Sequence, residues 1–289
     1  MVDRKKDHID MAFEAQVTQK HEGLYYEPML SAHPTQETDI SINFLGKQLE
    51  APLWISSMTG GTEKAKSINK NLATVANKYG IGMGLGSCRP LLDGSERIED
   101  FDFKSVIGDF PFYANLGVAQ LEQLIANKQL SKVKNLMSEL GVDGLIVHVN
   151  PLQEWTQPEG DKFKIAPIET IKQTLFELET NIIVKEVGQG FGPNSLISLM
   201  NLPLAAIDFA GHGGTNFTDL ELARHNALSE CKRLSFQSLA HVGHTAEEMI
   251  EWVNSSISGS KVKVQQFIIS GGINDVIQGH KLREKLKAK

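Results

Sequence analysis

The sequence predicts an α/β protein of the TIM (β/α)8 barrel type, with no recognisable eighth strand at the C-terminus. Three observations support this fold class. Short apolar runs alternate with helical patterns along the chain, most of these runs end in a turn that contains Gly or Asn, and the length of 289 residues suits one large core. Strands that alternate with helices form parallel βαβ units, and α/β barrels reach this size as single domains.

Composition indicates an ordinary globular protein and excludes some partners. Hydrophobic residues make up 41% of the chain and charged residues 22%, and the net charge is −6. A chain with this charge offers no basic field for phosphates, so we expect no nucleic-acid partner. No stretch reaches 18 apolar residues and the N-terminus has no apolar signal region, so we expect no membrane span and a cytoplasmic location.

The two cysteines, Cys88 and Cys231, lie far apart in the sequence and match no metal-ligand spacing. We expect two reduced thiols, which agrees with a cytoplasmic protein. Cys88 lies in a Gly-rich stretch where a nucleophile could stand, but the sequence positions no base beside it.

Residues 1–52 precede the regular alternation and form an N-terminal segment of the same single domain, whose barrel spans 53–289. The segment begins with a charged stretch over residues 4–9, and prolines interrupt its extended second half. Residues 40–45 alternate apolar and polar side chains, which predicts an accessory hairpin strand at the mouth of the barrel.

Seven apolar runs in order predict the strands of the barrel. They cover residues 53–57, 81–86, 112–114, 144–149, 182–184, 205–208 and 267–269, with helices expected at about 63–78, near 119–127 and at 276–287. Seven repeats favour a barrel over a doubly wound sheet. Without an eighth strand, the first and seventh strands would have unpaired edges. A neighbouring molecule or an irregular segment would then cover the gap, which favours a homo-oligomer, or the chain is a truncated form.

The stretch over residues 148–161 carries most of the polar chemistry. It follows the apolar run 144–147, and strand alternation puts Ile146, His148 and Asn150 on one side. From Asn150 to about Pro167 we expect a structureless loop. Loops of that length inside a compact domain are usually functional.

Turns that combine Gly with Ser, Thr, Asn or Lys follow nearly every predicted strand. Gly permits close backbone approach, so that N–H groups can bind a phosphate, and Lys185 would add positive charge. For a single turn of this kind, the need for glycine in a tight turn is as good an explanation as phosphate binding. Several on one face of a barrel favour a phosphorylated cofactor, with 270–272 as the phosphate turn.

Five motifs together resemble the type 2, FMN-dependent, isopentenyl diphosphate isomerases, and the similarity runs in order from residue 4 to about 275. Residues 4–9 match that family's N-terminal signature. The motifs are Met-Thr-Gly-Gly at 58–61, Gly-Ser-Cys-Arg at 86–89, His-Val-Asn-Pro-Leu-Gln-Glu with Pro-Glu-Gly-Asp at 148–161, Lys-Glu-Val-Gly-Gln-Gly at 185–190 and Gly-His-Gly-Gly-Thr at 211–215.

The resemblance implies a flavoprotein of isoprenoid biosynthesis that converts isopentenyl diphosphate to dimethylallyl diphosphate. Its cofactors would be reduced FMN, Mg²⁺ and NADPH or NADH as reductant. It implies catalytic roles for Gln153 and His148 and a Mg²⁺ ligand in Glu154. Substrate contacts would fall on Arg4, Lys5, Arg89, Asn150 and Gln153. FMN contacts would fall on Met58, Thr59, Gly60, Ser87, Asn115, Lys185, Thr215, Gly271 and Gly272.

These residue types suit the implied roles. One carboxylate suffices for Mg²⁺ if a diphosphate completes its oxygen shell. Gln153 is an amide and a poor base, which fits chemistry carried by a cofactor. Arg4 and Lys5 would lie on a basic segment that folds over the substrate, and Glu159 and Asp161 would only cap or hydrogen-bond the loop.

Two alternatives remain at the level of sequence. Another FMN barrel, a 2-hydroxy-acid oxidase or dehydrogenase, shares the phosphate turns and the fold. A truncated, inactive barrel that binds flavin weakly or not at all is the second.

Overall fold

A computed structural model describes residues 4–15, 25–30, 39–94, 96–157, 159–224, 230–259 and 262–288. The chain forms two compact units, Met1–Asp39 and Ile40–Lys289. The described part of the first unit contains helix α1 (Arg4–Met11), which has no buried residue. Arg4 and Lys5 lie on this exposed helix.

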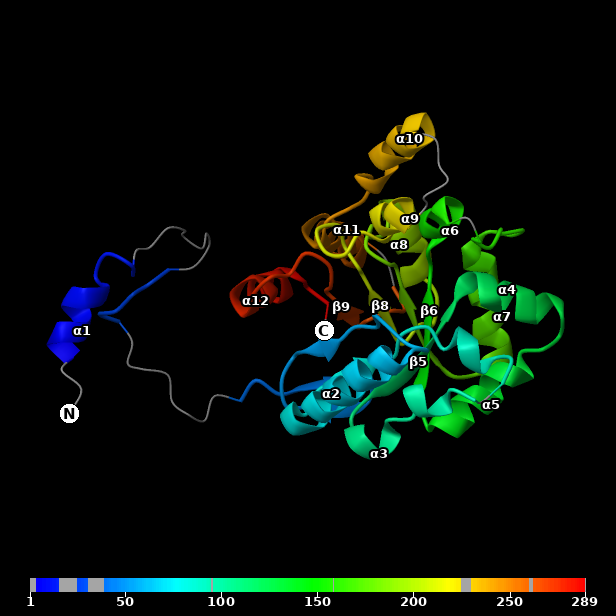
Figure 1. The fold of residues 1–289 in the computed structure, drawn as a ribbon, viewed down its shortest axis with the longest axis horizontal. Coiled ribbons are helices and arrows are strands. Elements are labelled where there is room, and N and C mark those ends of the chain that lie inside the picture. Colours follow the sequence, from blue (N-terminus) through cyan, green and yellow to red (C-terminus); the bar gives the residue numbers. More distant parts are fainter. Residues whose placement is uncertain are drawn as a thin grey trace. The chain divides into compact units, whose positions relative to one another are not determined.

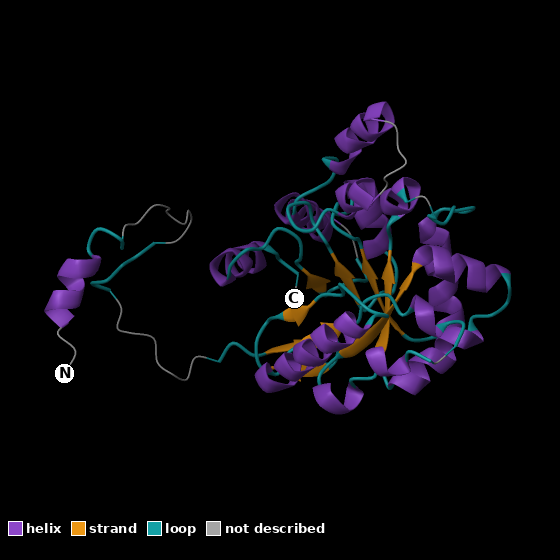
Figure 2. Ribbon diagram, in the orientation of Figure 1, coloured by secondary structure: helices purple, strands orange, loops and turns teal. Residues whose placement is uncertain are grey.

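The second unit is built on a parallel sheet of seven described strands. Their order in the sheet is their order in the sequence, from β3 to β9, as expected for a barrel of βαβ repeats. Figure 2 shows these strands gathered at the centre with helices around them. The strands are β3 (Trp54–Ile55), β4 (Gly82–Gly84), β5 (Phe112–Gly117), β6 (Gly144–His148), β7 (Asn181–Lys185), β8 (Ala206–Asp208) and β9 (Phe267–Ile268). All seven predicted strands are confirmed in position and order.

The helices connect the strands and cover the outer side of the sheet (Figure 1). Helix α2 (Glu63–Tyr79) begins where the Thr62 side chain accepts a hydrogen bond from the Ala65 N–H, and it ends at Gly80, whose φ is +61°. The remaining helices of the unit are η1 (Arg89–Leu91), η2 (Ile98–Asp100), α3 (Lys104–Ile107), α4 (Val118–Ala126), α5 (Ser131–Leu140), α6 (Pro151–Thr156), α7 (Pro167–Leu178), α8 (Pro193–Met200), α9 (Phe217–Arg224), α10 (Glu230–Ala240), α11 (Ala246–Gly259) and α12 (Val276–Lys285). No described helix has the length and apolar character needed to cross a membrane.

Alternate residues of each strand face two different apolar clusters. On β6, Leu145 and Val147 belong to the large cluster that includes the helices. Ile146 belongs to a smaller cluster with Tyr113 and Ile183 from the neighbouring strands. The alternation predicted around residue 146 is therefore confirmed, and the inner face of the barrel is identified by the smaller cluster.

An antiparallel hairpin closes the amino end of the barrel. It consists of β1 (Ile42–Phe44) and β2 (Lys47–Leu49). The Leu45 N–H donates to Gln266 Oε1 at 3.0 Å, just before β9, and Lys47 pairs with Asp143, just before β6, at 2.7 Å. The hairpin predicted at the mouth therefore lies where the strands begin, away from the end at which barrel enzymes hold their sites.

The two outer strands of the sheet, β3 and β9, do not pair with each other in the described structure, as expected for a barrel with seven strands. A buried carboxylate joins the segments that flank this seam. The Ser56 hydroxyl donates to Asp208 Oδ2 at 3.2 Å, and the Ser270 hydroxyl donates to Asp208 Oδ1. Asp208 therefore connects the residues after β3 and β9 at the carboxyl end of the strands.

Candidate active site

Three neighbouring strands place an amide, an imidazole and an ammonium group together at the carboxyl end of the barrel. His148 ends β6 and lies directly opposite Lys185 on β7. His148 Nδ1 is 2.6 Å from Asn115 Oδ1 on β5. Lys185 Nζ donates to the Glu186 carbonyl at 2.7 Å and is buried. The parallel register therefore brings Asn115, His148 and Lys185 to one place, as predicted.

His148 is a neutral imidazole in this site. Burial, and then the nearby charge of Lys185, lowers the pKa of His148 to about 4. The Asn115 oxygen can only accept, so we assign the proton to Nδ1 and leave Nε2 as an acceptor. A Cβ on Gly117 would lie 2.7 Å from Nε2, so glycine is needed beside the ring. His148 therefore offers an acceptor and no positive charge at neutral pH.

Residues 151–156 form the short helix α6, so the expectation of a structureless span from Asn150 to Pro167 is wrong. The helix starts with Pro151 at its first position, directly after Asn150, and both are common helix-start residues. The Asn150 amide nitrogen donates to Gln153 Oε1 at 3.1 Å and to Glu154 Oε1 at 2.9 Å. Gln153 and Glu154 are therefore fixed by a helical turn and by Asn150.

Glu154, the predicted metal ligand, is a buried and hydrogen-bonded carboxylate. It is 7% exposed, and its second oxygen accepts from the Asp161 N–H at 2.7 Å. Asn150 Oδ1 is buried without a hydrogen-bond partner in the described structure. No group of three or more His, Cys, Asp or Glu residues surrounds a common point among the described residues. Glu154 and Asn150 Oδ1 are therefore two buried oxygen donors that lie on neighbouring positions of the site.

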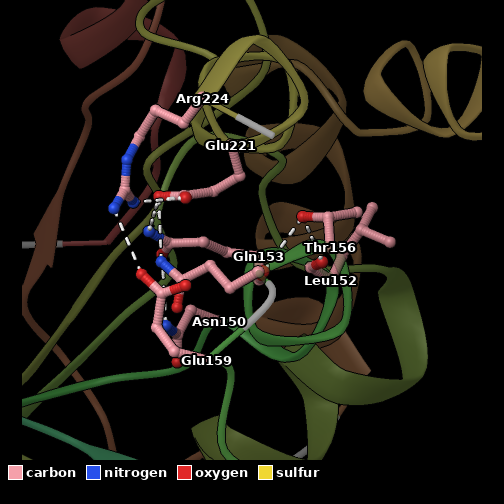
Figure 3. Close-up of polar contacts among 8 residues, drawn as sticks. Asn150, Leu152, Gln153, Thr156, Glu159, Glu221 and Arg224 are labelled. Carbon is pink, nitrogen blue, oxygen red and sulfur yellow. Dashed lines mark hydrogen bonds and ion pairs between the residues drawn. The ribbon is translucent and has the colours of Figure 1, made fainter. Parts of the chain in front are cut away.

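The sequence did not point to Glu221 and Arg224 on α9, which contact Gln153 and Glu159 (Figure 3). Glu221 is 2% exposed and accepts from Gln157 Nε2 at 2.9 Å and from Gln153 Nε2 at 3.4 Å. Arg224 Nη1 donates to the other oxygen of Glu221 at 2.5 Å, and Nη2 donates to Glu159 at 3.1 Å. The available signal was a Glu–Arg pair at helical spacing soon after the Gly-rich turn at 211–215.

The Gly-rich turns after β8 and β9 leave backbone N–H groups without acceptors among the described residues. Gly271 and Gly272 both have positive φ, at +90° and +72°. Their N–H groups, and that of Thr215, donate to no other residue in the described structure. A Cβ on Gly271 would lie 2.0 Å from the Gly211 carbonyl oxygen, so packing of the two turns also requires glycine there. The turns after β8 and β9 therefore lie against each other with free donors.

The turns after β3 and β4 are packed together in the same way. A Cβ on Gly86 would lie 2.1 Å from the Thr59 carbonyl oxygen, and a Cβ on Gly60 would lie 2.4 Å from the Phe101 ring. Ser57 directly precedes Met58, and its Oγ is buried without a hydrogen-bond partner among the described residues. These turns carry Met58, Thr59, Gly60 and Ser87 at the carboxyl ends of their strands.

The turn after β7 is organised by Glu186. One oxygen of this carboxylate accepts hydrogen bonds from the N–H groups of Val187, Gly188, Gln189 and Gly190, at 2.6 to 2.9 Å. Burial raises the pKa of Glu186 and outweighs the lowering effect of these bonds. The turn that follows Lys185 is therefore held by a carboxylate of the chain itself.

Two further predicted groups are located by the structure. Arg89 at the start of η1 pairs with Asp161 at 3.1 Å. Cys88 is a free, buried thiol whose pKa burial raises to about 12, which excludes it as a thiolate nucleophile at neutral pH. Cys231 lies in a part of α10 whose side chains are outside the described residues.

Known proteins resemble the chain in sequence and in fold. No family model matches it. The isopentenyl-diphosphate delta-isomerase of Rickettsia rickettsii (strain Sheila Smith) is 36% identical over 291 residues, which cover 97% of this chain and 80% of that relative. The enzyme of the same name from Rickettsia akari (strain Hartford) is 36% identical over 286 residues, covering 96% of this chain and 80% of the relative.

Solved structures show the same fold at much lower identity. A mandelate oxidase variant with a monooxide FMN adduct has a TM-score of 0.50 and 12% identity, and the match covers 86% of this chain and 67% of the oxidase. A second mandelate oxidase variant, with 2-hydroxy-phenylacetamide, has a TM-score of 0.51 and 12% identity over 89% of this chain and 69% of the oxidase. These structures support the barrel fold alone. The sequence relatives carry the assignment further: the chain is an enzyme of the isopentenyl-diphosphate delta-isomerase family.

Proposed function

We propose that this isomerase belongs to the type 2 class, which converts isopentenyl diphosphate to dimethylallyl diphosphate with reduced FMN and Mg²⁺. The observation that carries the proposal is the placement of Lys185 at the end of β7 and of Gln153 and Glu154 on α6, the helix that follows the neighbouring strand β6. These groups offer a cation for a flavin phosphate or ring, an amide for orientation and a carboxylate for a metal.

The residues present fit a flavin nucleotide. Lys185 and Asn115 would contact the flavin ring, and the N–H groups of Thr215, Gly271 and Gly272 would bind its phosphate. The turns after β3 and β4, which carry Met58, Thr59, Gly60 and Ser87, would enclose the other side. When bound and reduced, FMN supplies an electron-rich ring system that can exchange protons with an alkene, and NADPH or NADH would keep it reduced.

The diphosphate side of the site would be built around the metal. Glu154 would bind Mg²⁺, with Asn150 Oδ1 as a neighbouring oxygen, and the diphosphate would complete the shell. Arg89 would contact the diphosphate directly. Arg4 and Lys5 remain proposed substrate contacts.

The chain's own groups would position the substrate and exclude water. Gln153 cannot take up a proton at neutral pH, and His148 is neutral, so each would act through hydrogen bonds. Glu221 orients Gln153 by accepting from its amide nitrogen. A 2-hydroxy-acid oxidase, the alternative from sequence, is supported by a shared fold at 12% identity, whereas the isomerase relatives share 36%. A homo-oligomer and a cytoplasmic location remain predictions.

The direct test is an anaerobic assay of isopentenyl diphosphate conversion with FMN, Mg²⁺ and NADPH. We expect dimethylallyl diphosphate to form only when flavin, metal and reductant are all present. Conversion that continues after flavin is removed would contradict the type 2 assignment. Conversion in the presence of a metal chelator would contradict the role of Mg²⁺.

A further inference from the structure

Asp161 lies where three separate segments of the barrel's carboxyl end meet, and the roles described above leave it unused. Its side chain is 16% exposed. One oxygen accepts from Arg89 Nη1 at 3.1 Å and from Gln120 Nε2 at 2.9 Å, and the other accepts from Gln123 Nε2 at 3.0 Å. A single carboxylate therefore ties η1 and α4 to the loop that follows α6.

The backbone of the same residue is tied to the proposed metal ligand. The Asp161 N–H donates to Glu154 Oε2 at 2.7 Å. Gly160 packs so closely on α6 that a Cβ at this position would lie 1.8 Å from the Glu154 carbonyl oxygen. The loop therefore holds the Glu154 side chain only when Gly160 packs against α6 and the Asp161 N–H points at the Glu154 carboxylate.

We propose that Asp161 is a positioning residue whose carboxylate sets Arg89 for the diphosphate, while its backbone N–H holds Glu154 on the same loop. The inference rests on the proposed function, because it takes Arg89 and Glu154 as the groups that receive a metal-bound diphosphate. Asp161 itself would touch neither the metal nor the substrate.

Physical reasons favour a positioning role for this ion pair over a stabilising one. The Arg89 side chain is 56% exposed, and exposed ion pairs add little to stability. An exposed arginine samples many rotamers, and ordering it on ligand binding has an entropic cost. A guanidinium has five N–H donors and only Nη1 is used by Asp161, so the remaining donors can bind a diphosphate. The two glutamine amides hold the Asp161 carboxylate in place.

The test compares Asp161→Asn with a matched control at the opposite end of the barrel. Asn preserves the size of the side chain and the backbone N–H to Glu154 but removes the charge that holds Arg89. Asp143→Asn is the control, because Asp143 also pairs with a basic side chain, Lys47 at 2.7 Å, and accepts from a backbone N–H. The measurements are the KM and kcat for isopentenyl diphosphate, the calorimetric Kd for inorganic pyrophosphate with Mg²⁺, and the Tm.

For Asp161→Asn we expect KM and the pyrophosphate Kd to rise by about three- to tenfold, with kcat changed by less than about twofold. Asp143→Asn should lower the Tm and leave KM and Kd unchanged. If Asp161 acts through Arg89, the effect on KM and Kd should disappear when Asp161→Asn is added to Arg89→Met.

Three outcomes would overturn the inference. They are unchanged KM and Kd, a loss confined to Tm, and an effect of the same size in the Arg89→Met background. Failure of the proposed function itself is recognised from the unsubstituted protein, which would then neither convert isopentenyl diphosphate nor bind pyrophosphate with Mg²⁺. That result would contradict both the proposed function and the role of Asp161. An active parent whose KM and Kd do not change in Asp161→Asn would contradict only the role of Asp161.

Discussion

The two ends of the barrel bury different kinds of side chain. At the amino end, Phe44 and Leu49 of the hairpin pack with Trp54 and Tyr113. The centroid of the Trp54 ring lies 5.8 Å from that of Phe44 and 6.0 Å from that of Tyr113, and both pairs are edge-on. At the carboxyl end, the buried groups include Glu154, Lys185 and Asp208. Burial of polar groups is unfavourable unless they are paired. The amino end is therefore built mainly from large apolar and aromatic side chains, whereas the carboxyl end buries charged groups, as expected for the end that carries the candidate site.

The largest effect on function is expected from Glu154→Gln. Loss of the carboxylate should reduce Mg²⁺-dependent turnover by at least about 100-fold, because the metal would have no charged protein ligand. FMN should remain bound, since no proposed flavin contact changes. Flavin content and steady-state rate measure the two effects. Glu169→Gln on the surface of α7 is the matched control, and equal rates for the two variants would remove Glu154 as the ligand.

The largest effect on stability is expected from Leu49→Ala at the amino end. Leu49 is 1% exposed, and removal of a buried leucine side chain costs about 2–5 kcal/mol of unfolding free energy. Leu234→Ala on α10 is the control, because Leu234 is 56% exposed. Urea denaturation gives the stability, and the KM of Leu49→Ala should equal that of the parent at temperatures where it is folded. A changed KM would show that a substitution at the amino end also affects substrate binding, and would contradict the division of stability and function between the two ends.

An intermediate effect is expected from Lys185→Met, which keeps much of the side-chain volume and removes the charge. FMN affinity should fall by about 10- to 100-fold, measured by flavin fluorescence, because a buried cation that pairs with an anionic cofactor is lost. The pKa of His148 should also rise, since Lys185 is the second cause of its depression. Unchanged flavin affinity would discard Lys185 as a cofactor contact.

The smallest effect concerns acid stability. The pKa of His148 is about 4 in the folded chain, against 6.5 for a histidine surrounded by water, so the folded chain binds fewer protons between these values. Stability contributed by the neutral ring is present above pH 6.5 and is lost as the pH falls towards 4. Between pH 7 and pH 5 the loss should be roughly 1–2 kcal/mol larger in the parent than in His148→Gln, by urea denaturation. Identical losses would show that the pKa of His148 is not depressed.

The parts of the molecule that the sequence predicts well are those built from local apolar pattern. Each strand from β3 to β9 is a run of apolar residues followed by a turn, and all were located. Asn115, His148 and Lys185 lie on neighbouring strands, because parallel strands in sequence order bring their carboxyl ends together. Helix α6 was missed because it is six residues long and mostly polar, so periodicity could not reveal it.

The contacts that were missed join residues far apart in the sequence. Glu221 meets Gln153 across 68 positions, and Asp208 meets Ser56 across 152. Asp161 meets Arg89 across 72. Such pairings depend on how helices and loops fold back over the barrel, and no local pattern encodes them. Motifs therefore predicted the groups of the candidate site, whereas the residues that hold those groups became visible only in the structure.

In the proposed function, flavin and metal-bound diphosphate lie together at the carboxyl end of the strands. The most direct measurement is the absorption spectrum of the FMN-loaded protein during titration with isopentenyl diphosphate under anaerobic conditions. We predict a saturable change of the flavin spectrum that requires Mg²⁺ and is absent in Glu154→Gln. A bound flavin whose spectrum stays constant at substrate concentrations that support turnover would contradict the claim.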